Sequence, residues 1–563
     1  MNGLQVTVLL GVAVLAAAML APRLHIAAPL ILLIGGLALG FVPDLRAIEL
    51  PPEAVLLLFL PVMLFWESLT TSLRSIKQDF RGIVILSTLL VVATAFAVAG
   101  IAHALGIPWP AALVLGAALA PPDATAVAAL GRALPHRNFM LLKAESLTND
   151  GTALVLYAIA VGIAVGGNYT ALEITGLVVL SYAGGLAAGA VVAGLAYLTL
   201  RRVHDALSIN IALILVPFVA YLLAELIHAS GVLAVVAAGL IIAYTSGRIS
   251  TASSRRQTES VWPLGAYLLN GSLFVLIGLE VQAVTQDLSA SDFGRLSVIV
   301  AAVWVGLVAV RFGFLTATVT LIRLLDRRPS QRARRMSYRA RLVSAFAGFR
   351  GAVSLAIALS VPTTTNSGEA FPARDDIIFV TAGVVVLTLL VQGPLLPSVV
   401  RWAQLPENST AAHELALAEH AITTSALAAL PEIADKHRIS RPVRHKLAED
   451  YNEHLELIAA TTQTPAPSPE RKVDPLATAL RDTADEAAED GTGPETPPCS
   501  LDEHAPLARY TEYTQLQLAL LSHQRDELSQ LRHTSTIDDS VARQIQTRLD
   551  VEELRLTGVD SFE

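Results

Sequence analysis

The chain has 563 residues and a mean hydropathy of +0.56; 53% of its residues are hydrophobic and only 16% are charged. A soluble globular chain carries about 25% charged residues, so an ordinary soluble enzyme is excluded. Residues 1–403 hold 26 basic and 19 acidic side chains, whereas residues 404–563 hold 14 and 29. This acidic balance argues against a nucleic-acid partner. The single cysteine, Cys499, excludes an intrachain disulfide.

Apolar runs recur from Leu4 to about Trp402, and each is long enough to cross the hydrocarbon core of a bilayer as a helix. The chain is therefore predicted to be an all-α polytopic membrane protein with about thirteen transmembrane helices. We place these spans, in chain order, at residues 4–21, 27–43, 53–71, 83–106, 109–130, 138–165, 171–200, 207–226, 229–246, 260–283, 296–322, 342–362 and 376–400.

Charged residues in the predicted loops indicate the orientation. Loops on one side contain Arg23, Arg74, Lys77, Arg81, Arg132, Arg137, Arg201, Arg202, Arg248, Arg255, Arg256 and eight arginines between 323 and 341. The opposite loops contain only Arg46, Arg295 and Arg374. Because positive residues stay in the cytoplasm, the N-terminus is predicted outside and the tail inside.

In the third, fifth and sixth spans, and again in the eleventh and twelfth, ionisable side chains interrupt the apolar sequence. Such residues are costly inside a membrane and are usually functional. Away from the predicted helix ends, they are Glu67, Asp123, Lys143, Glu145, Asp150, Arg311 and Arg350. The two arginines require partners at this depth, and the acids outnumber the three basic residues, so at least one carboxylate is expected to be available for exchange.

The fifth span contains Pro121, Pro122 and Asp123 in sequence. Two prolines remove two amide donors, so the helix must be interrupted beside the acid, and the released carbonyls must face protein or a cavity. Glycines flank Arg350 in the twelfth span and predict a second interruption. If spans 1–6 and 8–13 form inverted repeats, the two interruptions correspond, which is typical of a transport site between repeats and places Arg350 opposite Asp123. A simple proline kink is the alternative.

In the sixth span, residues 143–152 read Lys-Ala-Glu-Ser-Leu-Thr-Asn-Asp-Gly-Thr. On a helix, Glu145 and Asn149 share one face, and Ser146 and Asp150 share the neighbouring face. Their oxygens suit a small hard cation, and a carboxylate can exchange that cation for a proton. A polar contact between helices is the alternative. Asp150 disfavours it, because an unpaired charge requires a water-filled cavity.

The tail, residues 404–563, has helical spacing of Leu, Ile and Ala at 409–460 and 505–556. The segment 461–498 is rich in Pro, Thr, Ala and Glu and is predicted to be a disordered linker. We interpret the tail as an acidic cytoplasmic appendage with a regulatory or dimer-contacting role and an unidentified ligand or partner.

Four motifs together resemble those of the monovalent cation/proton antiporters, in the sodium/proton exchanger branch that has an Asn-Asp pair. They are Glu-Ser-Leu-Thr-Asn-Asp-Gly at 145–151, Pro-Pro-Asp-Ala at 121–124, Ser-Gly-Val-Leu-Ala-Val-Val-Ala-Ala-Gly at 230–239 and Phe-Arg-Gly-Ala-Val-Ser-Leu at 349–355. The similarity covers nearly all of residues 1–403, which we assign as the transmembrane antiporter domain.

The resemblance implies that Asp150 binds the cation and the proton in turn, with Asn149 beside it. Asp123 would shape the site through Asn149 or water. Further implied ligands are the Glu67 carboxylate, the Ser146 hydroxyl and the Pro122 carbonyl, so that Asp150, Glu67 and Ser146 bind the monovalent cation.

The same resemblance implies structural roles for three other charged residues. Glu145 would form a salt bridge with Arg311, and Arg350 would stabilise the crossing of the interrupted helices. It also implies a homodimer in which a core bundle moves past a dimerisation bundle.

Two features depart from related branches. The family commonly has Thr-Asp-Pro in the fifth span, whereas this chain has Pro122-Asp123-Ala124 and lacks the threonine hydroxyl, which bears on ion preference. The electrogenic branch has two adjacent acids where this chain has Asn149-Asp150. One exchanging carboxylate indicates electroneutral exchange of one proton for one cation.

We therefore expect a plasma-membrane antiporter, not an enzyme, that needs no cofactor and exchanges Na⁺, or Li⁺ or K⁺, for H⁺ by alternating access in pH and sodium homeostasis. One alternative is a K⁺/H⁺ antiporter with a regulatory tail. A cation channel is disfavoured by the matched interruptions and by the lack of a selectivity-loop repeat. An intramembrane hydrolase is unsupported, because the spans contain no paired-Asp, HExxH or Ser/His motif.

Overall fold

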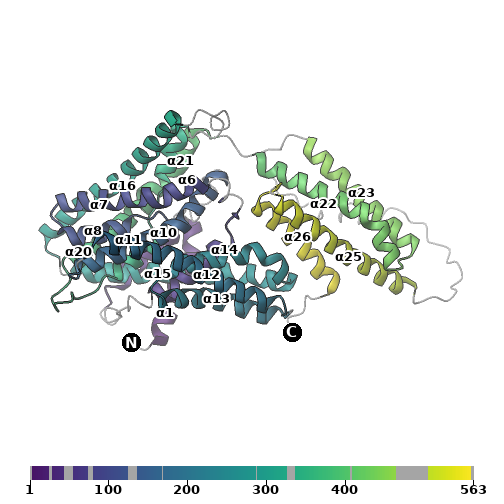
Figure 1. Cartoon of the computed structure of the whole chain (residues 1–563), viewed down its shortest axis with the longest axis horizontal. Coiled ribbons are helices and arrows are strands. Elements are labelled where there is room, and N and C mark those ends of the chain that lie inside the picture. The colour runs from purple at the N-terminus through teal and green to yellow at the C-terminus, as the bar shows by residue number, and fades with distance from the viewer. Residues whose placement is uncertain are drawn as a thin grey trace. The chain divides into compact units, whose positions relative to one another are not determined.

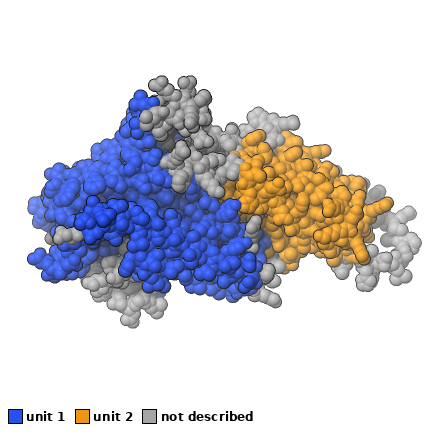
Figure 2. All heavy atoms as spheres, in the orientation of Figure 1, with its two compact units in different colours: residues 1–408 blue, residues 409–563 orange. Residues whose placement is uncertain are grey.

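The structure is a computed structural model that describes residues 3–24, 28–42, 55–73, 76, 80–123, 136–167, 169–203, 205–286, 288–325, 337–405, 409–463, 505–534 and 536–558. Regular structure in these ranges is helical, apart from one isolated antiparallel bridge between Thr364 and Ala370. The predicted all-α class is confirmed. The chain forms two compact units, Met1–Asn408 and Ser409–Glu563, which we call the membrane unit and the tail unit (Figures 1 and 2).

The first half of the membrane unit contains the helices that correspond to predicted spans one to six. They are α1 (Gly3–Leu24), α2 (Ala28–Leu39), η2 (Val55–Phe59) running into α4 (Leu60–Leu69), α6 (Phe80–Ile85) running through η3 (Leu86–Leu90) into α7 (Val91–Ala104), α8 (Trp109–Leu119) and α10 (His136–Ala164). The η segments are π-helical turns.

The second half continues with the helices of predicted spans seven to thirteen. They are α11 (Ala171–Val179), η4 (Leu180–Gly184) and α12 (Gly185–Leu200) in succession, α13 (Ala206–Leu226), α14 (Gly231–Ile249), α15 (Ala252–Gln286), α16 (Ala290–Leu325), α18 (Tyr338–Phe346), α19 (Ala352–Leu359), and α20 (Arg374–Leu387), η5 (Thr388–Gln392) and α21 (Gly393–Ala403) in succession.

Length and hydropathy support a membrane location for these helices. Among the described residues, seven helical stretches are long and apolar enough to cross a membrane: Gly82–Ala104, Leu142–Ala164, Ala171–Leu200, Ala206–Leu226, Ala252–Gln282, Ala290–Leu321 and Arg374–Ala403. Five shorter apolar helices are Val8–Leu24, Ala28–Leu39, Leu57–Leu69, Trp109–Leu119 and Gly231–Gly247. Together with the broken pair α18 and α19, they account for the thirteen predicted spans.

Both predicted interruptions are present. Helix α8 ends at Leu119, and residues 120–123 are not helical. The predicted continuation of this span to residue 130 lies outside the described residues. In the twelfth span, residues 347–351 separate α18 from α19. The proline and glycine residues at these positions explain the breaks, because they lack an amide donor or weaken a helix interior.

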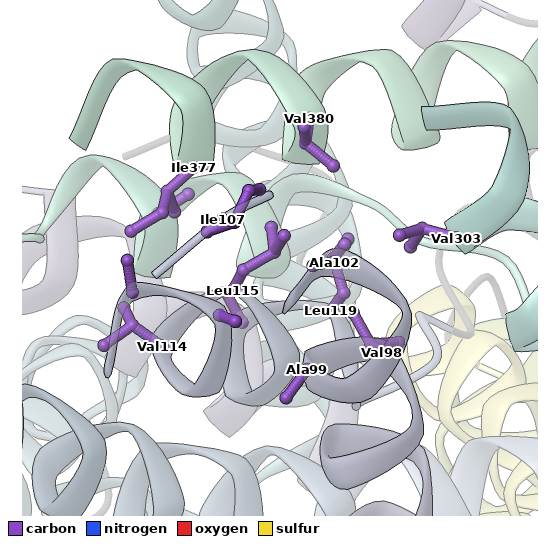
Figure 3. Packing of buried hydrophobic residues seen from close by; sticks show 14 of the residues in the cluster. Val98, Ala99, Ala102, Ile107, Val114, Leu115, Leu119, Val303, Ile377 and Val380 are labelled. Atoms are coloured by element: carbon purple, nitrogen blue, oxygen red, sulfur yellow. The ribbon is translucent and has the colours of Figure 1, made fainter. Parts of the chain in front are cut away.

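An apolar cluster holds α8 in place. Val98 of α7, Leu115 of α8, Val303 of α16 and Val380 of α20 are buried against one another in this cluster (Figure 3). Between membrane helices, such side chains stabilise the packing through dispersion contacts. The last residues of α8 are therefore anchored on a rigid scaffold, which positions the first interruption.

Glycines allow α2 and α15 to pack at backbone contact. A Cβ on Gly36 would lie 2.1 Å from the Val275 carbonyl oxygen, and one on Gly278 would lie 2.3 Å from the Leu33 carbonyl oxygen. Small residues permit this close approach between membrane helices, where dispersion forces replace the hydrophobic effect.

The tail unit is helical, as predicted. Its helices are α22 (Ser409–Lys436), α23 (Arg441–Gln463), α25 (Ala505–His533) and α26 (Asp539–Thr557). Each predicted helical stretch is divided into two, and at the first division Arg438 has a φ of 56°, which ends the helix. Buried apolar residues such as Ile422, Leu521 and Ile545 join α22, α25 and α26. Most of the predicted linker, from residue 464 onward, lies outside the described residues.

Candidate functional site

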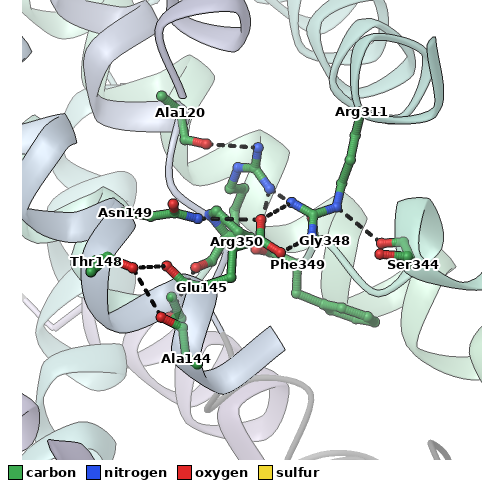
Figure 4. A network of polar contacts seen from close by, with 12 residues as sticks. Ala120, Ala144, Glu145, Thr148, Asn149, Arg311, Ser344, Gly348, Phe349 and Arg350 are labelled. Carbon is green, nitrogen blue, oxygen red and sulfur yellow. Dashed lines mark hydrogen bonds and ion pairs between the residues drawn. The ribbon is translucent and has the colours of Figure 1, made fainter. Parts of the chain in front are cut away.

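Helix α10 carries a fully paired acid near its start. Arg311 of α16 donates from Nη1 to Glu145 Oε1 and from Nη2 to Glu145 Oε2, both at 2.7 Å (Figure 4). Arg311 Nε also donates to the Ser344 carbonyl at 3.0 Å. Glu145 and Arg311 are 4% and 3% exposed. A bidentate pair whose Nε donor is also hydrogen-bonded is an arrangement that tolerates burial.

Arg350 belongs to the second interruption, and its side chain bonds to backbone carbonyls of both interrupted helices. Its Nε donates to the Leu119 carbonyl at 2.5 Å and its Nη2 to the Ala120 carbonyl at 3.2 Å. Its Nη1 donates to the Gly348 carbonyl at 2.7 Å. Helix ends leave such carbonyls unsatisfied, so a buried guanidinium can use them as partners. Arg350 thereby joins the end of α8 to the loop before α19.

The backbones of the two interruptions also meet directly. The Asp123 amide donates to the Phe349 carbonyl at 2.8 Å. A Cβ built on Gly351 would lie only 1.6 Å from Asp123 Oδ2, so this carboxylate oxygen packs against the glycine backbone. Gly351 is the N-cap of α19, and the positive end of the helix dipole favours a carboxylate there. Asp123 is therefore fixed where the two broken helices cross.

A cavity opens beside this crossing. Its lining residues come from α4, the first interruption, α10 and α19: Met63, Leu64, Glu67, Pro121, Pro122, Asp123, Ser146, Asp150, Val353 and Ser354. The cavity has a volume of about 10 Å³, counted over the positions open to the centre of a water molecule. This is enough for roughly one small guest. Three of the ten lining residues are carboxylic acids and none is basic. The cavity can therefore attract a single small cation.

The structure brings together five of the expected binding residues. Glu67, Pro122, Asp123, Ser146 and Asp150 all line the cavity. Ser146 Oγ donates to the Pro122 carbonyl at 3.1 Å, which links α10 to the first interruption. Asp123 and Asp150 are 9% and 4% exposed, so both acids are removed from bulk solvent.

Asn149 faces a different neighbour. Its Nδ2 donates to Glu145 Oε1 at 3.4 Å, and it is not one of the residues that line the cavity. Its Oδ1 is buried and has no hydrogen-bond partner among the described residues. Asn149 thus connects the Glu145–Arg311 pair to the turn of α10 that carries Asp150.

Lys143 and Ser354 have positions that the motifs did not reveal. Lys143 Nζ donates to Thr70 Oγ1, at 2.5 Å, just beyond α4. Val353 and Ser354 form the α19 side of the cavity, and Ser354 follows Arg350 by four residues. Ser354 also stands within the motif at 349–355, but a serine among apolar residues did not stand out.

Two interrupted helices that meet beside an acidic cavity are typical of secondary transporters. The family described as "Sodium/hydrogen exchanger, transmembrane" matches residues 10–402, and the chain belongs to it. The protein is thus a multi-pass membrane protein of a family of monovalent cation/proton antiporters. The expected family is confirmed.

Individual relatives agree with this assignment. An uncharacterized Na⁺/H⁺ exchanger of Mycobacterium tuberculosis is 40% identical over 557 residues, covering 98% of this chain and 96% of the relative. A sodium, potassium, lithium and rubidium/H⁺ antiporter of Bacillus pumilus is 33% identical, covering 66% of this chain and 57% of the relative. The sodium proton antiporter MjNhaP1 of Methanocaldococcus jannaschii shares the fold, with a TM-score of 0.54 at 17% identity, covering 71% of this chain and 99% of the neighbour.

Proposed function

We propose that this protein exchanges Na⁺, with Li⁺ or K⁺ as further substrates, for H⁺ at one site centred on Asp150. The observation that carries this proposal is the cavity whose lining combines Glu67, Asp123 and Asp150 with the Ser146 hydroxyl. Carboxylate and hydroxyl oxygens suit a hard cation, and a carboxylate can bind a proton instead. Asp150 is the exchanging group, while Glu67, Ser146 and the Pro122 carbonyl complete the cation site.

The charges around the cavity support a one-for-one exchange. Four acids and three basic residues belong to this region: Glu67, Asp123, Glu145, Asp150, Lys143, Arg311 and Arg350. When all are ionised, the region carries one net negative charge. One monovalent cation or one proton neutralises it, and a neutral region crosses the membrane at a lower energetic cost. Exchange is therefore electroneutral, and coupling follows because the empty site does not cross.

In this mechanism, the structural charges keep the crossing rigid. Arg350 bonds the carbonyls at both interruptions, and the Glu145–Arg311 pair joins α10 to α16. The cation and the proton then compete for the same carboxylate on either side of the membrane. Since the cavity has room for about one small guest, alternating access fits better than an open channel.

A K⁺/H⁺ antiporter is the second candidate. The Bacillus pumilus relative is named as an antiporter of potassium as well as of sodium and lithium. In this chain, Pro122 and Ala124 flank the acid of the first interruption where the family commonly has threonine and proline. Both observations favour testing the three cations side by side.

We further propose that residues 1–403 form the antiporter domain of a plasma-membrane homodimer that serves pH and sodium homeostasis. The excess of arginine and lysine in alternate loops supports an external N-terminus and a cytoplasmic tail at 404–563. Many of the loop arginines used for this orientation, including Arg46, Arg74, Arg132 and the block from Arg327 to Arg335, lie outside the described residues. The acidic tail unit would regulate transport.

The test is reconstitution of the full chain in liposomes that contain a pH-sensitive dye, with the membrane potential clamped. An outward Na⁺ or K⁺ gradient should drive internal acidification, and an inward gradient alkalinisation, at rates that are independent of voltage. Lowering the pH should raise the half-saturating cation concentration, by at most about tenfold per pH unit, because the proton competes for the site. Asp150→Asn should abolish the exchange.

Three results would contradict the proposal. They are proton movement at the native rate in Asp150→Asn, a rate that follows the imposed voltage, and a half-saturating cation concentration that does not change with pH. Cation currents without proton movement would indicate a channel.

A further inference from the structure

Helix α19 supplies one wall of the cavity, and its role is not explained by the acids of α4 and α10. Two of its residues, Val353 and Ser354, face the same space as Asp150 and Glu67. Valine contributes no cation ligand. Ser354 is therefore the polar group that the second interrupted helix offers to this cavity.

The hydroxyl of Ser354 is available for a guest. A serine within a helix commonly donates to the carbonyl four residues earlier. For Ser354 that carbonyl belongs to Arg350. The Arg350 carbonyl oxygen accepts a hydrogen bond from Thr388 Oγ1 of η5 at 3.3 Å. Ser354 lines the cavity although the residue is only 2% exposed, and the structure shows no hydrogen bond from its side chain to another described residue. A hydroxyl that borders a cavity can use the guest of that cavity as its partner.

Two other serine hydroxyls near the cavity or α19 differ from Ser354, because they have protein hydrogen-bond partners. Ser360, which follows α19, donates from Oγ to Tyr157 Oη at 2.9 Å and to the Ile357 carbonyl at 2.8 Å. Ser146 is bonded to the Pro122 carbonyl. Ser354 has neither kind of partner, and it lies on the side of the cavity formed by the other half of the chain.

We propose that Ser354 Oγ is a ligand of the transported cation and sets which alkali ion is preferred. The inference rests on the proposed function and extends its site from α4, α10 and the first interruption to α19. With Ser354 included, the cation is bound from both interrupted helices. Any movement that separates these helices would then release it.

The size of the ion determines how much affinity is lost when one ligand is removed. Li⁺ and Na⁺ bind their oxygens at short distances and lose more when a ligand is removed, whereas the larger K⁺ binds each oxygen more weakly. Removal of the hydroxyl should therefore change the order of preference as well as the affinity. A merely structural serine would change stability without changing the ratio between ions.

The experiment compares Ser354→Ala with the wild type in the full-length reconstituted protein, using Li⁺, Na⁺ and K⁺ separately. We expect the half-saturating Na⁺ concentration to rise about three- to tenfold, on the scale of one lost polar contact. The rate at saturating Na⁺ should stay within about twofold, since the ligand acts in binding. The ratio of Na⁺ to K⁺ affinity should fall.

Ser354→Thr retains the hydroxyl and should restore the wild-type ratio. Ser354→Cys replaces the hydroxyl by a soft and somewhat larger thiol, so it should behave like Ser354→Ala; it also serves if the alanine variant does not fold. Ser360→Ala is the matched control, because its hydroxyl has protein partners. It should leave the ion ratio unchanged.

Unchanged half-saturation and ion ratios in both Ser354→Ala and Ser354→Cys would overturn the role of Ser354. That result leaves the proposed function intact if the wild type still exchanges cations for protons and Asp150→Asn does not. Failure of the proposed function is seen separately, as exchange that persists in Asp150→Asn. Cation-dependent thermal stabilisation of the purified variants provides a second readout that does not need transport.

Discussion

Glu145 and Asp150 are two acids on one helix with opposite surroundings. Each is 4% exposed. Glu145 receives two hydrogen bonds from Arg311, whereas Asp150 faces a cavity that is lined by two further acids. Burial therefore does not distinguish the paired acid Glu145 from Asp150, which we propose as the exchanging acid. The distinction comes from whether another protein group permanently neutralises the charge.

Helix geometry explains how α10 supports both roles. Five residues turn an α-helix by about 500°, so the two side chains point about 140° apart. Glu145 faces α16, and Asp150 faces α4 and α19. One face holds the helix in the bundle while the other faces the cavity.

The sharpest way to break this comparison is to neutralise each acid separately. Glu145→Gln should lower the free energy of unfolding by about 3–5 kcal/mol, because it leaves Arg311 buried without a carboxylate. Asp150→Asn should leave stability unchanged or raise it while abolishing exchange. Thermal and denaturant unfolding in detergent, together with the liposome assay, measure both. Equal destabilisation by the two variants would refute the comparison.

A double variant tests whether the Glu145–Arg311 pair acts as a unit. Glu145→Gln combined with Arg311→Gln should be more stable than the sum of the single effects by about 2 kcal/mol, since no uncompensated charge remains. The measurement is a double-mutant cycle of unfolding free energies. Strict additivity would mean that the two side chains do not stabilise each other.

A substitution where the two interrupted helices meet tests whether the cavity that Asp150 faces depends on the position of Asp123. Gly351→Ala places a methyl group where Asp123 Oδ2 lies. Exchange should slow at least about tenfold, because displacement of a positioned group by roughly 1 Å is sufficient. Gly313→Ala in α16 is the matched control, since nothing lies within 4 Å of the added carbon. Equal rates in both variants would show that the position of Asp123 is unimportant.

The smallest effect is expected at Ser146. Ser146→Ala removes the hydrogen bond to the Pro122 carbonyl and one hydroxyl from the cavity. The half-saturating cation concentration should rise about threefold or somewhat more. Thr148→Ala is the control, because that hydroxyl bonds to the Ala144 and Glu145 carbonyls of its own helix. If Thr148→Ala has the same effect as Ser146→Ala, the cavity-facing position is not the cause.

Hydropathy was sufficient to locate the helices of the membrane unit, because apolar length in a membrane protein is set by the bilayer. Prolines and glycines were likewise sufficient to place both interruptions, since their effect on a helix is local. The paired helices of the tail unit were harder to separate. Their division at Arg438 depends on a single residue with positive φ, which composition does not reveal.

The sequence pointed to some of the side chains around the cavity and not to others. Glu67, Asp123 and Asp150 were found because a carboxylate inside a span is conspicuous. Ser354 was missed, since a serine is common within membrane helices and only its position beside the cavity distinguishes it. The contact of Gly351 with Asp123 likewise depends on a backbone approach that spacing does not encode.

The sequence by itself determined the class of protein, the order of its membrane helices, the positions of the breaks and the set of charges that need an explanation. These follow from local composition and from the cost of polar groups in a bilayer. Only the tertiary structure decided which charges are neutralised. Arg311 is 166 residues from Glu145, and Arg350 is 231 residues from Leu119. Whether a buried charge has a partner depends on which helices meet, and that is settled by the packing of the whole bundle.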